Sequence, residues 1–246
     1  MRNAIVAAAA GILLIGSAAP AAEPPAKPAA ALSDQAELSY VQTTGNTKTQ
    51  TLAAKNLLSY RFTGSTTGSW SLSALRGEDQ GRTTAESYAT ELRLDHLLTE
   101  RVYVYGMAGW NKNRFAGLDQ RYYGGAGAGD KLLAGPRHVL LAEAGLNETR
   151  EEFTDNTAKT FLTGRAFAKY EYAFTPKSRC SQSLEYLHDF SDSKHYKLVS
   201  ETAVTAAVTD VLSLKVGYTV RYDHQPIPAA LRKTDTVLAA ALVVNI

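Results

Sequence analysis

Lysine, arginine and carboxylate side chains recur at every second residue in several segments of this chain. In residues 211–222, Lys215 and Arg221 share one parity, while leucine, valine and tyrosine occupy the other. Residues 157–174 repeat the pattern around Arg165. Side chains two residues apart lie on the same face of a β-strand, so these charges would gather on one face of a sheet.

If such a sheet closes on itself with the charged face inward, these residues line a lumen. The residues that parity assigns to it are nine basic and seven acidic: Lys55, Arg61, Arg93, Lys159, Arg165, Lys169, Lys197, Lys215, Arg221, Glu91, Asp95, Glu143, Glu171, Glu185, Glu201 and Asp235. An ion-selective filter needs rings of one sign. The mixture of both signs therefore favours a lattice of salt bridges over a selective filter.

Other polar residues could in principle do chemistry, and for each of them we prefer a simpler interpretation. A Ser–His hydrolase site would have to come from the group His188, Ser191, Ser193 and His195, which we interpret as a coincidence within a serine-rich loop. An acidic cation site would have to come from Glu148, Glu151, Glu152 and Asp155, which lack the pattern of a calcium loop. We predict no catalytic residues, no metal and no cofactor.

The elements that position the charges are predicted to be long strands. Turn-forming clusters recur about every 18 residues, against roughly 8 to 12 in soluble sandwiches. A tilted strand of roughly 9 to 11 residues crosses a bilayer. We expect twelve strands, at residues 35–44, 47–62, 69–77, 84–97, 101–113, 119–133, 137–149, 157–174, 179–189, 195–208, 211–222 and 233–246.

Alternation alone does not decide whether the apolar face points inward, as in a soluble barrel, or outward toward lipid. Strand length and the number of charges on the polar face favour outward. Tyrosines near strand ends, namely Tyr60, Tyr103, Tyr172 and Tyr222, suit an interfacial girdle, and His96, His138 and His224 are also expected there. The alternating glycines Gly125, Gly127 and Gly129 would allow a bulky lumenal side chain to approach closely.

The amino terminus predicts export. A positive start, an apolar run and Ala19-Pro20-Ala21 indicate a signal peptide at residues 1–21, followed by a Pro/Ala-rich linker at 22–33 and a barrel domain at 34–246. The balanced net charge of +2 gives no reason to expect nucleic acid, and the single Cys180 cannot form an intramolecular disulfide. Short connections at one end of the barrel favour placing both chain ends on the periplasmic side.

Several short motifs, spread over the whole chain after the linker, resemble one known family. They lie at residues 37–51 with a Gly45-Asn46-Thr47 turn, 76–78, 94–95, 103–106, 114–119 and 125–129. The chain is similar to the salt-induced outer-membrane proteins (YdiY-like), whose domain has no established function. The resemblance implies an outer-membrane β-barrel and transfers no catalytic residues. The chain departs from many outer-membrane barrels in ending at Ile246 and not at an aromatic residue.

We therefore predict an all-β protein, a single antiparallel up-and-down transmembrane β-barrel of about 12 strands, in the outer membrane of a Gram-negative bacterium. We expect it to be non-enzymatic, an envelope structural component or a narrow passive channel. The alternatives are a small-solute transporter or porin and an outer-membrane lipid-modifying hydrolase. The expected partners are outer-membrane lipids, lipopolysaccharide and, during insertion, the barrel-assembly machinery.

Overall fold

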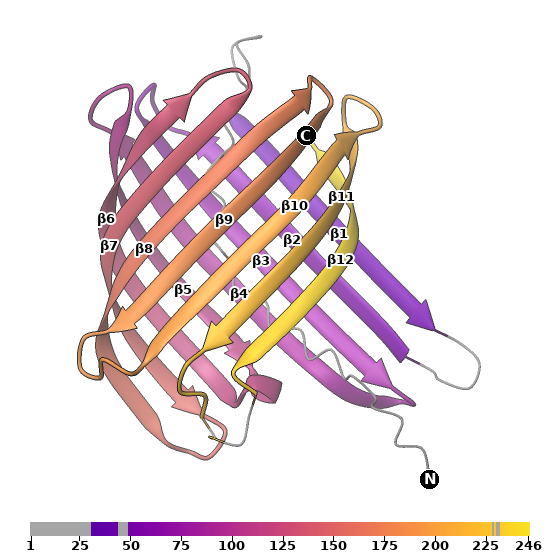
Figure 1. The fold of residues 1–246 in the computed structure, drawn as a ribbon, viewed down its shortest axis with the longest axis vertical. Helices are drawn as coiled ribbons and strands as arrows, with labels where there is room; N and C mark the ends of the chain where they lie inside the picture. The colour runs from indigo at the N-terminus through magenta and orange to yellow at the C-terminus, as the bar shows by residue number, and fades with distance from the viewer. Residues whose placement is uncertain (1–30, 44–48, 228, 230–231) are drawn as a thin grey trace.

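A computed structural model describes residues 31–43, 49–227, 229 and 232–246 as a closed barrel of twelve antiparallel strands (Figure 1). Each strand pairs with its neighbours in the chain, and β1 closes on β12, which confirms the predicted all-β, up-and-down architecture. The signal peptide predicted at 1–21, most of the linker and the Gly45-Asn46 turn lie outside the described residues. The strands are β1 (Leu32–Thr43), β2 (Thr49–Arg61), β3 (Thr66–Asp79), β4 (Arg82–Leu97), β5 (Val102–Asn113), β6 (Leu118–Ala134), β7 (His138–Phe153), β8 (Ala158–Thr175), β9 (Ser178–Asp189), β10 (Tyr196–Ala207), β11 (Leu212–Asp223) and β12 (Thr234–Asn245).

The two ends of the barrel differ in their connections. At one end, which we call the short-turn end, β1 begins and β12 ends (top in Figure 1). Its turns lie at residues 62–65, 98–101, 135–137, 176–177 and 208–211. The opposite loop end holds connections at residues 80–81, 114–117, 154–157 and 190–195, and the described residues 224–227 and 232–233 of the β11–β12 connection. A short 3-10 helix, η1 (Arg114–Ala116), makes up most of the β5–β6 connection. It ends at Gly117, whose positive φ of 77° suits a residue without a side chain.

Two strand bounds at the loop end differ from the sequence prediction. The loop expected at residues 78–83 is a two-residue turn, in which Gln80 and Gly81 both have positive φ and let the β3–β4 ladder run to the Asp79–Arg82 pair. The loop expected at residues 150–156 is largely strand, because β7 continues to Phe153 in register with β6. This extension of β7 was not predicted because its residues are mostly polar, and polar side chains occur both in solvent-exposed loops and on the lumenal face of a strand.

The outer face of the barrel is apolar. Leu38, Leu92, Leu162, Leu214 and Val216 are all exposed, and Leu92 keeps 60% of its surface accessible. The most deeply buried side chains of the described residues include charged and polar ones, such as those of Glu151 and Asp189. This orientation is the reverse of a soluble barrel and is the arrangement that places lipid outside and polar residues in a lumen. Within the described part of the chain, no helix is long and apolar enough to cross a membrane.

Aromatic residues gather on the outer face near both ends. At the short-turn end, Tyr60 packs edge-on against Phe62 with ring centroids 5.0 Å apart, and His138 Nδ1 lies 2.7 Å from the Tyr170 hydroxyl. At the loop end, the Tyr222 hydroxyl lies 2.8 Å from His224 Nδ1. Such rings, with an apolar body and a polar tip, are typical of the girdles at the edges of a membrane.

Candidate functional site

The centre of the lumen is organised around the carboxylate of Glu143 on β7. Arg93 Nη2 on β4 donates to Glu143 Oε1 at 2.7 Å, and Arg165 Nη1 on β8 donates to Oε2 at 2.6 Å. The Tyr103 hydroxyl on β5 donates to Oε1 at 2.6 Å. The side chains of Arg165 and Glu143 are 0% exposed. Strands β4 and β7 are separated by β5 and β6, so the Arg93–Glu143 pair joins strands that are not neighbours, through the lumenal side of the sheet.

Further contacts extend this group into a lattice. Arg93 also pairs with Asp95 at 2.7 Å, and Arg165 Nε donates to Glu185 on β9 at 2.6 Å. The ring of Tyr105 lies under Arg93, with the guanidinium carbon 4.2 Å from the ring centroid. Its hydroxyl accepts from Arg165 Nη1 at 3.0 Å. We call these residues the central lattice: Arg93, Asp95, Tyr103, Tyr105, Glu143, Arg165 and Glu185.

Glycines of the neighbouring strands make room for the lattice tyrosines. A Cβ atom built on Gly129 would clash with the Tyr103 ring, and one built on Gly127 would clash with Tyr105. The predicted role of the β6 glycines, close approach of a bulky lumenal side chain, is confirmed at these two positions. The prediction that Tyr103 belongs to the interfacial girdle is wrong, because its ring lies over Gly129 inside the barrel and is 5% exposed.

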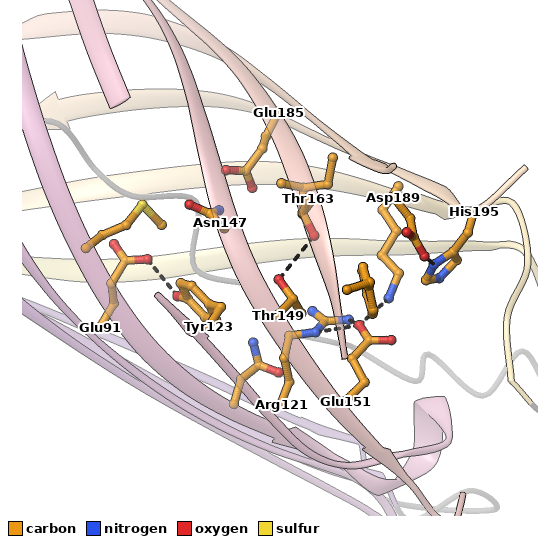
Figure 2. A pocket seen from close by; sticks show the side chains of 15 residues that line it. Glu91, Arg121, Tyr123, Asn147, Thr149, Glu151, Thr163, Glu185, Asp189 and His195 are labelled. Atoms are coloured by element: carbon orange, nitrogen blue, oxygen red, sulfur yellow. Dashed lines mark hydrogen bonds and ion pairs between the residues drawn. The ribbon is translucent and has the colours of Figure 1, made fainter. Parts of the chain in front are cut away.

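Between the lattice and the loop end lies a pocket with about 590 Å³ of empty space, part of it open to solvent (Figure 2). Its wall includes Glu91, which accepts a hydrogen bond of 2.6 Å from the Tyr123 hydroxyl, and Thr163, which donates to Thr149 at 3.2 Å. Glu185 of the central lattice also lines it. The lattice therefore contributes one residue to the wall of a cavity that is lined by both acceptors and donors.

Two further ion-pair groups lie at the loop end of this pocket. Glu151 accepts from Arg121 Nε at 2.7 Å and from Lys197 on β10 at 2.8 Å, which is another contact between strands that are not neighbours. Asp189 pairs with Lys159 at 2.6 Å and lies 3.1 Å from His195 Nδ1.

Arg121, Glu151 and Asp189 were not among the residues predicted to line the lumen, although Asp189 shares the parity of Glu185 in the same predicted strand. Glu151 was hidden by its expected place in a loop. It shares the parity of Glu143, and extending β7 by four residues beyond its predicted end would have identified it.

The other predicted lumenal residues lie along β8, β10, β11 and the neighbouring strands. Lys215 bridges Glu37 at 3.1 Å and Glu201 at 3.2 Å, and Lys169 pairs with Glu171 at 2.6 Å. The remaining four predicted residues, Arg221, Asp235, Lys55 and Arg61, do not form one group. Arg221 is buried in register with Asp235, and Lys55 is half-buried in register with Glu37. Arg61 is the last residue of β2 and is exposed.

The four residues of the hydrolase alternative do not form one constellation. His195 is buried against Phe161 in the lumen, whereas His188 packs with Tyr186 and Phe190. The Ser191 hydroxyl donates to Asp189 at 2.5 Å. Among the described residues, no hydrogen bond joins a serine to a histidine.

The predicted acidic group is also dispersed. Glu151 points into the lumen, and Glu152 bonds to Arg150 Nε at 3.0 Å. Asp155 accepts from the hydroxyl and the backbone N–H of Thr157, which hold the pKa of its carboxyl below the usual range. The part of the chain that the structure describes contains no cluster of three metal-ligating side chains.

Comparisons with known proteins agree with this architecture. Residues 36–246 match the family model described as protein of unknown function, DUF481. The chain is 30% identical over 198 residues to the uncharacterized protein YdiY of Escherichia coli (strain K12), covering 80% of this chain and 76% of YdiY. Among solved structures, an outer membrane channel from Pseudomonas putida F1 is similar with a TM-score of 0.59 and 11% identity, covering 93% of this chain and 99% of the channel. At 11% identity, the similarity to this channel shows a common fold only.

Proposed function

The chain belongs to the DUF481 family of proteins of unknown function, and from the geometry of its lumen we propose that it is a narrow passive channel in the outer membrane of a Gram-negative bacterium. The central lattice carries this proposal. Its arginines extend from β4 and β8 to Glu143 on β7, so that buried side chains fill the lumenal side of this part of the barrel. Twelve strands enclose a space between that of filled eight-stranded barrels and that of open porins with sixteen or more strands.

The lattice narrows the lumen without giving it one sign of charge. Arg93 and Arg165 are held by charge-assisted hydrogen bonds, which are shorter and stronger than neutral ones and fix the positions of both partners. Both guanidinium groups contact the Tyr105 ring, with their central carbons 4.2 Å (Arg93) and 5.6 Å (Arg165) from its centroid. Because acids and bases occur together in the lattice, we expect weak selectivity between small cations and anions.

Single-channel recording in planar bilayers tests the proposal. The wild-type protein should show a conductance well below that of a general porin, and the Arg93→Ala/Arg165→Ala variant should show a larger one. Arg150→Ala is the matched control, because Arg150 is exposed at the loop end, where it pairs with Glu152. Heat-modifiable migration in gels verifies that each variant forms a closed barrel.

Three results would contradict the channel. They are a wild-type conductance as large as that of a general porin, no conductance at all, and equal conductance in the wild type and the double variant. Absence of conductance would favour the structural role in the envelope. Lipid hydrolysis that is lost in His195→Ala would instead favour the enzymatic alternative.

A further inference from the structure

The seam between β1 and β12 is much shorter than every other seam of the barrel. Its ladder contains four residue pairs, from Gln35 with Asn245 to Leu38 with Leu242, whereas each other seam contains at least eleven. Beyond Leu38, residues 39–43 of β1 and 234–241 of β12 have no ladder partner on this side, although both stretches are described. The two strands diverge toward the loop end (Figure 1).

The unpaired edges lie among apolar outer side chains. Tyr40 on β1 is 56% exposed, and Leu238 on β12 is 72% exposed. Backbone groups without partners are costly in hydrocarbon, so an open sheet edge does not stay in contact with lipid tails alone. The edges must either line a space that polar groups can enter or close for part of the time. In either case, the seam between β1 and β12 is open for at least part of the time.

The lumenal face of β12 beside this opening is mostly apolar. Its inward positions hold Asp235 near the loop end and then Val237, Ala239, Ala241 and Val243, as the alternation of exposure along the strand shows. On β2, Ala53 packs with Leu75 and Ala85. Small apolar side chains therefore line the β12 flank of the opening, where an acyl chain would find apolar contacts.

A cation lies next to this apolar path. Lys55 on β2 stands in register with Glu37 on β1, but the Glu37 carboxylate is bound by Lys215 from β11. Within the described residues, the Lys55 ammonium has no hydrogen bond and no ion pair within 4.0 Å, although it is close enough to Glu201 for their charges to attract. An anionic head group could therefore be held at Lys55 while its chain extends between the two strands.

We propose that the β1–β12 seam is a lateral opening through which an amphiphile with one acyl chain and an anionic head passes between the lumen and the surrounding lipid leaflet. This route goes beyond the axial channel and does not depend on it. The central lattice and the opening lie on different walls of the barrel, so a variant of either leaves the other intact.

Cysteine cross-linking tests whether the seam is open. If the ladder continued, Tyr40 would face Ala240, and neighbouring antiparallel residues are close enough for a disulfide. Tyr40→Cys/Ala240→Cys in a Cys180→Ser background should oxidise at least about tenfold more slowly than Val216→Cys/Ala240→Cys, because Val216 and Ala240 are paired in the intact β11–β12 seam. Equal rates would overturn the proposal.

Fluorescence quenching tests for the amphiphile. A bimane label at Ala241→Cys, beside the opening, should be quenched by lysophosphatidylglycerol with a brominated chain, and a label at Thr205→Cys on β10 should not. Lys55→Gln should reduce this quenching at least about twofold, but should not change quenching by brominated lysophosphatidylcholine, whose head is zwitterionic. Absence of quenching at Ala241→Cys, or equal quenching at both sites, would refute the lateral route whatever the conductance of the barrel.

Discussion

Replacing Arg165 by methionine should destabilise the barrel strongly, because the central lattice depends on this guanidinium. Arg165 donates to Glu143 at 2.6 Å and to Glu185 at 2.6 Å, and its side chain is 0% exposed. Glu143 keeps Arg93 and Tyr103 as partners, whereas Glu185 loses its ion pair. Removing one partner of a buried pair leaves an uncompensated charge and costs about 3–5 kcal/mol.

The assay is equilibrium unfolding of the protein in lipid vesicles by guanidinium, followed by the fluorescence of the two tryptophans, Trp70 and Trp110. Arg150→Met is the control, since Arg150 is 58% exposed and its pair with Glu152 should contribute less than about 1 kcal/mol. Adding Glu185→Gln to Arg165→Met should recover at least about 1 kcal/mol, because the unpaired carboxylate is then neutral. A loss in Arg165→Met no larger than that in Arg150→Met would show that water, and not the lattice, fills the lumen.

Three other substitutions test separate parts of the structure. Gly129→Val should cost about 1–3 kcal/mol of unfolding free energy by forcing the Tyr103 ring aside, while Gly64→Val, with open space around it, should cost less than half as much in the same titration. Gly81→Val should slow refolding and destabilise the β3–β4 hairpin by about 1–2 kcal/mol, because φ at this position is +80°. Leu92→Arg on the outer face should cost about 2–4 kcal/mol in vesicles, and an unchanged stability would argue against lipid contact there.

The strands and their two faces could be predicted from the sequence because both follow from local alternation. Lys215 and Leu214, for example, differ in parity, and the structure places one in an ion pair and the other on the exposed face. Alternation did not show which face of the sheet contacts lipid, and that prediction needed the length of the strands as an additional argument. Turn residues placed the connections within a few positions, except where β7 extends.

What sequence reasoning missed depends on register between distant segments. Tyr103 has the composition of a girdle residue, and only its pairing with Gly129, 26 positions later, shows that its ring fits inside the barrel. The pairing of Glu151 on β7 with Lys197 on β10 likewise joins distant segments, because β8 and β9 lie between these strands. The short β1–β12 ladder leaves no trace in local patterning, because β12 alternates as regularly as the fully paired strands.

A nitroxide scan along β11 tests most directly whether the apolar rows meet lipid and the charged rows face the lumen. Labels placed one at a time at residues 212–222 of the protein in vesicles are compared for collisions with oxygen, which concentrates in lipid, and with a water-soluble nickel chelate. The account predicts a period of two in which oxygen reaches the even positions, such as 214 and 216, more readily than the odd ones. The opposite phase, or no alternation, would contradict it.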